Sequence, residues 1–305
     1  MNTIDTPKLS LRQRSKLLSK AARTVLKADK ELVAFPVLQS VVGTILLVCL
    51  AAIVFFTGTA TGSLGSSEGF SWHAHSIIAP VSFAIMYIGM TFIAHYFEAA
   101  VYAGAMQRFK GEDPTIESSL RQVNKKIRPL ILFSLLIATV GLILGAIEDK
   151  VPLAGKIAIW LFGAAWSVAN VFSIPTIITS EENIKPLEAT KNSVALIKKV
   201  WGESVALQLS VAFFGLSWIL LALLMSAAAG GLAGMLISPV AGGVLGGVLL
   251  VIGISIITTI TMTLVTIVKA AVFYYATTGE APEHFAKDLL HNTFTLKKSK
   301  KLFSN

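Results

Sequence analysis

The feature that most constrains this chain is a series of six long apolar runs separated by short polar segments. The runs cover approximately residues 32–56, 77–105, 130–147, 153–179, 204–228 and 239–277. A helix of about 20 apolar residues crosses the hydrocarbon core of a membrane. Hydrophobic residues make up 54% of the 305 residues and charged residues only 14%, against about 25% charged in soluble domains. The sequence therefore predicts an all-α integral membrane protein with six transmembrane helices.

Positive charge is distributed unevenly between the tails and loops, and this distribution predicts the orientation. Residues 1–30 hold eight Lys and Arg, the loop at 107–129 holds six and the loop at 180–202 holds four, whereas residues 58–76 and 229–238 hold none. Loops rich in Lys and Arg lie on the cytoplasmic side. We therefore expect both termini in the cytoplasm. The net charge of +9 then reflects membrane topology, and no nucleic acid partner is expected.

Polar segments beside the apolar runs divide the chain into three regions. We predict a basic amphipathic cytoplasmic helix over residues 1–31, a six-helix membrane domain over residues 32–277 and a basic amphipathic cytoplasmic segment over residues 278–305. Basic amphipathic helices bind anionic headgroups at the membrane surface. Membrane lipids are therefore predicted partners, whereas ordinary solvated connectors are the alternative. The apolar face of the N-terminal helix is formed by Leu17, Leu18, Ala21, Val25 and Leu26. The apolar face of the helix over residues 187–201 is formed by Leu187, Val194, Leu196 or Ile197, and Val200.

Three stretches of the sequence align as an internal repeat. They are "EAAVYAGAM" from Glu98, "VANVFSIPT" from Val168 and "KAAVFYYAT" from Lys269, each near the predicted cytoplasmic end of an even-numbered span. "GEDP" at Gly111 and "GEAP" at Gly279 follow the first and last stretches, and "EENIKP" follows the middle one. A polar helical segment comes after each proline, which suits the first turn of a helix. We therefore predict three pseudo-repeated hairpins linked by cytoplasmic amphipathic helices.

The segments "AGAMQRFKGEDPTIESSL", "GAAWSVANVFSIPTIITSEENIKPLEATKNSVALIKKVWGE" and "KADKELVAFPVL" resemble an uncharacterised family of polytopic bacterial membrane proteins, a domain of unknown function. More distantly, the chain is similar to the membrane region found beside glycerophosphodiester phosphodiesterase domains. This resemblance covers most of the chain and implies a multi-pass protein of the bacterial cytoplasmic (inner) membrane. It carries no catalytic residues across, and we expect no soluble phosphodiesterase domain in this chain.

A polar cluster is the first candidate site, because a few polar residues interrupt otherwise apolar spans. Glu98, Asn170 and Lys269 occupy related positions in the repeat, and His95 lies one helical turn before Glu98. A lone charge at the centre of a membrane helix is unfavourable by about 2.5–3.5 kcal/mol, so pairing or access to water is expected. Glu98 and Lys269 are predicted to face each other or to share a wet cytoplasmic pocket. The alternative is that they form a structural ion pair, or lie near the headgroups with the lysine reaching into them.

A glycine face is the second candidate site. Gly242, Gly243, Gly246 and Gly247 make two overlapping small-xxx-small steps, a spacing that lets helix backbones approach closely. They predict either a subunit interface or packing against a neighbouring span. The surrounding "GGLAGMLISPVAGGVLGG" is also the segment most suited to a re-entrant loop.

Enzyme and cofactor chemistry finds little support in the sequence. His95 and Glu98 share one helix face but have no third ligand for a catalytic metal, and the histidines of "WHAH" at 72–75 fit an interfacial loop. No phosphate-binding glycine motif is present. We therefore expect no enzyme activity, no cofactor and no metal.

Two functions remain. The first is a membrane scaffold that binds a membrane-protein partner or forms a homo-oligomer, favoured because the spans are poor in charge. The second is a transporter, channel or lipid-handling protein with a polar site near the cytoplasmic side. It is supported by the repeat and by Pro175, which kinks or loosens the fourth span near Asn170.

Overall fold

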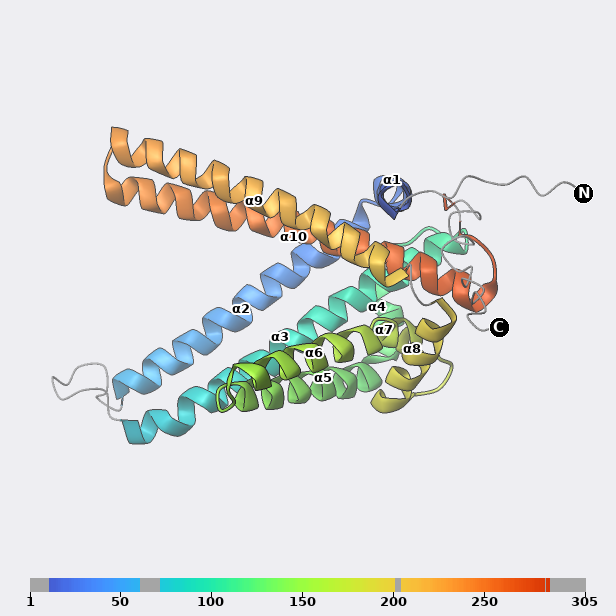
Figure 1. Ribbon diagram of the computed structural model, residues 1–305, viewed down its shortest axis with the longest axis horizontal. Helices are drawn as coiled ribbons and strands as arrows, with labels where there is room; N and C mark the ends of the chain where they lie inside the picture. The colour runs from blue at the N-terminus through green and yellow to red at the C-terminus, as the bar shows by residue number, and fades with distance from the viewer. Residues whose placement is uncertain (1–10, 61–71, 201–203, 283, 286–305) are drawn as a thin grey trace, which may run out of the picture. The chain divides into compact units, whose positions relative to one another are not determined.

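The computed structural model of the chain describes residues 11–60, 72–200, 204–282 and 284–285, and these ranges contain helices and no β-strand (Figure 1). The helices are α1 (Leu11–Ala28), α2 (Glu31–Ala60), α3 (Trp72–Phe109), α4 (Ile116–Lys125), α5 (Ile127–Glu148), α6 (Leu153–Ala169), α7 (Ser173–Thr179), α8 (Pro186–Val200), α9 (Ser204–Leu236) and α10 (Pro239–Thr278). The predicted all-α class is therefore confirmed for this part of the chain.

Five of the described segments are long and apolar enough to cross a membrane. They are Glu31–Leu50, Pro80–Phe109, Ile127–Glu148, Leu153–Thr179 and Gly242–Thr278. The predicted sixth span falls in α9, which is helical from Ser204 to Leu236. Within α9 the side chains of residues 204–219 lie outside the described part, and Leu220–Leu236 forms a shorter apolar helix. Five long apolar helices identify a membrane-embedded protein, while the count of six stays a prediction.

The chain forms two compact units. The first comprises the described residues up to Val33, those from Gly104 to Ile116 and those from Ala195 onward. The second comprises the described residues of 34–103 together with those of 117–194.

In the first unit, α9 and α10 form a long antiparallel hairpin and α1 packs against both of them. Figure 1 shows the two hairpin helices side by side. Only Ile237 and Ser238 separate them, and the glycine-rich segment is helical on both sides of this turn. A re-entrant loop of irregular backbone is therefore not present there. The row of α1 that becomes buried is Leu18, Ala22 and Val25, whereas Leu17 of the predicted apolar face is exposed.

In the second unit, α2 packs against α3, and α5 packs against α6. An added Cβ at Gly43 would lie 3.2 Å from Met90, and one at Gly89 would lie 2.8 Å from Leu46, so glycines allow close approach of α2 to α3. The α5–α6 hairpin turns at Asp149 and Lys150, both exposed. Its helices therefore end in charged residues that favour water.

The fourth predicted span is interrupted, and the structure divides it into α6 and α7. The interruption lies at Asn170–Phe172, upstream of Pro175. Asn170 and Phe172 leave the helical region, with φ/ψ of −98°/4° and −106°/13°. A proline ring clashes with the carbonyl four residues before it, here that of Val171. Pro175 is the third residue of α7, and its missing N–H therefore falls in the first turn, where no intrahelical acceptor exists.

Candidate functional site

The helix interruption in the second unit is stabilised by what we call the Asn170 cluster, formed by Asn170, Ser173, Thr190 and Ser193. The Asn170 side-chain amide donates to the carbonyl oxygen of Trp166 at 2.8 Å. Its side-chain oxygen accepts hydrogen bonds from the hydroxyls of Thr190 at 2.7 Å and Ser173 at 3.1 Å. Asn170 therefore joins α6, α7 and α8 at one point.

The connector helix α8 contributes two members of the cluster. Thr190 bonds to Asn170, and the Ser193 hydroxyl accepts the backbone N–H of Phe172 at 2.9 Å. That N–H belongs to the interruption and therefore requires an acceptor outside the regular helix pattern. Thr190, Ser193 and the neighbouring Ala189 are buried, whereas Leu187 of the predicted apolar face is 59% exposed. Ile197, a residue of the predicted apolar face, is also buried. The buried face of α8 is thus mostly small and polar, with one large apolar residue.

A lysine links two loops at the end of the same unit. The Lys126 ammonium donates to the carbonyl oxygens of Glu181 and Glu182 at 2.9 Å and 3.1 Å. Lys126 precedes α5, and the two glutamates follow α7. These two hydrogen bonds hold together the start of α5 and the loop after α7.

His95 lies in α3 and faces α5 within the second unit. Its Nδ1 is 2.9 Å from the Ser134 hydroxyl, and its ring centroid is 5.3 Å from that of Phe133. Tyr96, the next residue, donates a hydrogen bond to the Asn124 side chain at 2.8 Å. His95 is therefore placed at a contact between two membrane helices.

Glu98 and Lys269 are both half-buried, in α3 and α10. They fall in different compact units. Their pairing, and the sharing of one pocket with Asn170 and His95, stay predictions.

The four candidate glycines separate into two pairs, of which only one faces α9. An added Cβ at Gly242 would lie 2.5 Å from the Cα of Gly234, and one at Gly246 would lie 3.2 Å from the Cα of Gly230. Gly242 and Gly246 therefore lie where the backbones of α9 and α10 approach closely. An added Cβ at Gly243 or Gly247 meets nothing within 4 Å. This second pair lies on the open side of the hairpin.

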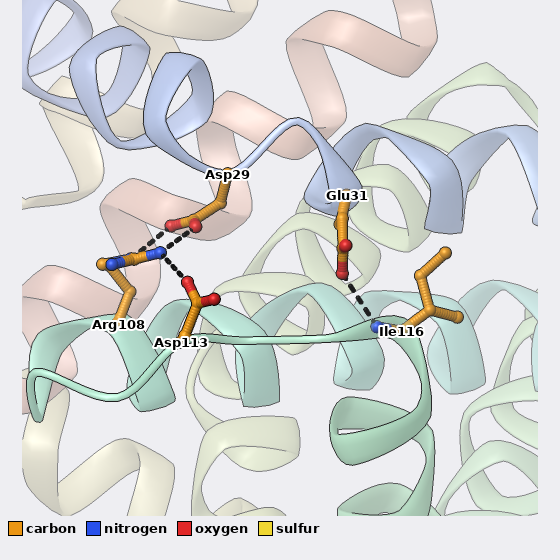
Figure 2. Close-up of polar contacts among 5 residues, drawn as sticks. All are labelled: Asp29, Glu31, Arg108, Asp113 and Ile116. Carbon is orange, nitrogen blue, oxygen red and sulfur yellow. Dashed lines mark hydrogen bonds and ion pairs between the residues drawn. The ribbon is translucent and has the colours of Figure 1, made fainter.

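A charged cluster at the end of α3 was not found from the sequence (Figure 2). This Arg108 cluster consists of Asp29, Arg108 and Asp113, all in the first unit. Arg108 donates through Nε to Asp29 at 2.6 Å, through Nη2 to the second oxygen of Asp29, and through Nη2 to Asp113 at 2.6 Å. The Asp29 side chain is 4% exposed and that of Asp113 is 88% exposed. The strong bidentate contact is therefore the buried one.

Beside this cluster, a second carboxylate fixes the start of a connector. The Glu31 side chain accepts the backbone N–H of Ile116, the first residue of α4, at 3.0 Å (Figure 2). The first N–H groups of a helix have no partner within the helix and favour negative charge. The start of α2 thus caps the start of α4.

The two "GE-P" turns of the repeat share one local geometry. Gly111 and Gly279 have φ of +80° and +75°, which non-glycine residues rarely adopt. The N–H of Glu112 bonds to Gln107 and that of Gly111 bonds to Arg108, a Schellman ending, while the N–H of Gly279 bonds to Tyr275. Both helices therefore end at a left-handed glycine. The middle copy ends at Ser180 in extended backbone, and the threefold repeat stays a prediction.

Other sequence candidates lie partly outside the described residues. Outside the described residues lie the side chains of "WHAH" at 72–75 and most of the C-terminal segment at 278–305. Within the described ranges, no group of three His, Cys, Asp or Glu side chains is arranged to hold a metal ion.

Long apolar helices, glycine contacts and connectors bonded at the helix ends define an all-helical, membrane-embedded protein. The chain belongs to DUF6159, a family of unknown function, which matches residues 77–283. This match includes the Asn170 cluster and the α9–α10 hairpin, but Asp29 lies before it. No curated protein and no solved structure matches the chain. The expected similarity to a family of unknown function is thereby confirmed, whereas the link to phosphodiesterase membrane regions and the bacterial source stay predictions.

Proposed function

We propose that this protein is a non-enzymatic membrane scaffold, which holds its connector helices in fixed positions to bind a membrane-protein partner or a second copy of itself. The observation that carries this proposal is the Asn170 cluster. There, Thr190 and Ser193 of α8 bond directly to the interrupted membrane helix.

The proposed topology has six membrane helices in three hairpins, with both termini in the cytoplasm of a bacterium and the hairpins in its inner membrane. The basic loops at 107–129 and 180–202 and the uncharged segments at 58–76 and 229–238 support this orientation. Lys20, Arg23 and Lys27 are exposed on α1. In this topology they face anionic headgroups, which attract juxtamembrane basic residues.

Polar groups near the helix ends support a scaffold because they bond to other parts of the same chain. The Asp29 carboxylate, at the end of α1, bonds to Arg108 at the end of α3. Glu31 caps α4, and Lys126 binds the loop after α7. Each contact fixes a connector or a loop within its own unit, and a fixed connector presents a defined surface to a partner.

A transporter or lipid-handling protein is the second candidate, because an interrupted membrane helix with an asparagine is a feature of transport sites. At such sites, the groups freed by the interruption bind the substrate. Here the Asn170 side-chain oxygen accepts two hydroxyls, and the N–H of Phe172 is bonded to Ser193. These protein partners favour the scaffold.

Reconstitution of the purified full-length chain into proteoliposomes tests the proposal. We expect fluxes of K⁺ and H⁺ and rates of fluorescent phospholipid scrambling equal to those of empty vesicles. We also expect more than one copy per particle, or a co-isolated membrane protein, when native membranes are extracted without detergent into polymer nanodiscs. Flux above the empty control supports the transporter instead. Solitary monomers in the nanodiscs contradict the scaffold.

A further inference from the structure

The α9–α10 hairpin is longer than a membrane is thick. α9 has 33 residues and α10 has 40, which correspond to about 50 Å and 60 Å at 1.5 Å per residue. The hydrocarbon core of a bilayer is about 30 Å thick. From Lys269 to Val240, beside the turn, α10 rises roughly 44 Å. If the hairpin stood upright with Lys269 at one surface, its turn would leave the core on the other side.

The hairpin has no charged residue near its turn, where such an exit from the hydrocarbon core would occur. Residues 204–268 contain no Asp, Glu, Lys or Arg. At the turn, Met235, Leu236, Ile237 and Val240 are 88%, 82%, 75% and 76% exposed. Ser238 is the only polar side chain among residues 235–240. Because apolar surface of this extent is unfavourable in water, the turn requires an apolar environment.

Lipid acyl chains match that environment better than a protein partner does. Exposed apolar side chains occur along both helices of the hairpin, including Leu224, Met225, Leu232, Val244, Val248 and Ile256. A partner protein would cover one face of the pair. A helix that is hydrophobic on every side belongs inside a membrane or a large protein core.

We infer that the turn of the α9–α10 hairpin is immersed in the acyl chains of the leaflet opposite the chain termini and does not emerge into water. An inclination of about 40°, at the upper end of the range for membrane helices, reduces the height of the roughly 44 Å segment to about 34 Å. Local thickening of the bilayer accommodates the remainder. The inference rests on the proposed membrane placement and is independent of the scaffold role.

Spin-label accessibility in proteoliposomes tests the inference. Cys49 is the only cysteine of the chain, so Cys49→Ala provides a background for single cysteines. Met235→Cys and Val240→Cys place a nitroxide on either side of the turn, and two positions guard against one variant failing to fold. Lys150→Cys places the matched control in the charged turn of the α5–α6 hairpin. Power saturation with oxygen reports lipid, and saturation with a water-soluble nickel chelate reports water.

We expect labels at 235 and 240 to be relaxed by oxygen and not by the nickel chelate, whereas the label at 150 shows the reverse. Relaxation of 235 and 240 by nickel to the extent seen at 150 places the turn in water and overturns the inference. Low relaxation by both reagents means that protein covers the turn and also overturns it. If the label at 150 is relaxed by oxygen and not by nickel, the two turns do not differ, and this result also overturns the inference. None of these outcomes depends on the flux or oligomer measurements that test the scaffold.

Discussion

Two hairpins of this protein consist of similarly apolar helices but differ in the length of those helices and in the residues at the turn. α5 and α6 have 22 and 17 residues, about 33 Å and 26 Å long, and turn at the exposed, charged Asp149 and Lys150. α9 and α10 are far longer, and their turn is uncharged. The α5 helix of the first hairpin matches the thickness of a membrane, and the turn of that hairpin is charged. The second hairpin exceeds that thickness, and its turn has no charge.

The two units that contain these hairpins also differ in how their helices are held together. In the second unit, hydrogen bonds of the Asn170 cluster join the α6–α7 interruption to α8. In the first unit, Gly230 and Gly234 of α9 lie against Gly242 and Gly246 of α10. Lipid supplies no hydrophobic force between helices, so close packing and hydrogen bonds are the available means of association. This chain uses hydrogen bonds where a connector meets a helix end and glycine contacts along the uncharged pair.

Substitution at the glycine contact should have the largest effect. Gly242→Leu would drive a side chain into the backbone of α9, which cannot move aside, and we expect a loss of more than about 3 kcal/mol of stability. Gly243→Leu, one residue along on the open side, is the matched control and should be close to neutral. SDS titration followed by far-UV circular dichroism measures both. Equal losses would show that the two glycine pairs are not distinguished by the α9 contact.

The buried carboxylate of the Arg108 cluster should come next. Asp29→Ala leaves the Arg108 guanidinium without its buried partner, and we expect destabilisation of about 3 kcal/mol. Asp113→Ala removes the exposed partner of the same arginine, for which about 0.5 kcal/mol is expected because solvent screens the pair. Thermal unfolding in detergent compares the two variants. A larger shift for Asp113→Ala would reverse the assignment of the stronger contact.

Loss of the Asn170 side chain, which joins α6, α7 and α8 in the second unit, should have an intermediate effect. Asn170→Ala leaves the Thr190 hydroxyl and the Trp166 carbonyl without this partner, and about 2 kcal/mol is expected. The control Thr176→Val removes a hydroxyl that bonds to the carbonyl of Phe172, the residue before α7, without involving α8, and should be nearly silent. Hydrogen exchange should also rise across residues 186–194 in Asn170→Ala alone. Unchanged exchange there would mean that Asn170 does not hold α8.

The smallest effect is expected at the α3–α5 contact. Ser134→Ala removes one hydrogen bond from His95, and we expect a loss of about 1 kcal/mol. Thr91→Val, one turn before His95, removes a hydroxyl that bonds to the carbonyl of Tyr87 in its own helix. Its shift in SDS titration should be smaller. A neutral Ser134→Ala would mean that the hydrogen bond between His95 and Ser134 does not stabilise this contact.

The helices could be predicted from the sequence because apolar length and the absence of charge are local properties. The helix ends at Gly111 and Gly279 could be predicted for the same reason, because the left-handed backbone conformation that ends a helix favours glycine. The contact of Asp29 with Arg108 could not be found in this way, since 79 residues separate them and neither lies in a recognisable motif. Gly242 and Gly243 have the same sequence pattern, and only the position of α9 separates the packed pair from the open one.

The position of the helix interruption could not be predicted from the sequence either. Pro175 signals a disturbance, but the backbone yields at Asn170–Phe172 because α8 supplies hydrogen-bonding partners there. That connector was predicted from its apolar residues, of which Ile197 is buried, but the other buried residues of its face are Ala189, Thr190 and Ser193. Small polar residues carry little hydropathy signal, and their role emerges only from the packing.

In this account, polar groups near the helix ends hold connectors and do not line a water-filled passage. The reactivity of cysteines in α8 toward a water-soluble thiol reagent tests this central claim most directly. In the Cys49→Ala background, Ser193→Cys probes the buried cluster and Lys191→Cys probes the exposed side of the same helix. We expect the cysteine at 191 to react as a free thiol and the cysteine at 193 to remain unmodified in proteoliposomes until the protein is denatured. Comparable rates at the two positions would reveal a water-filled path to Asn170 and contradict the account.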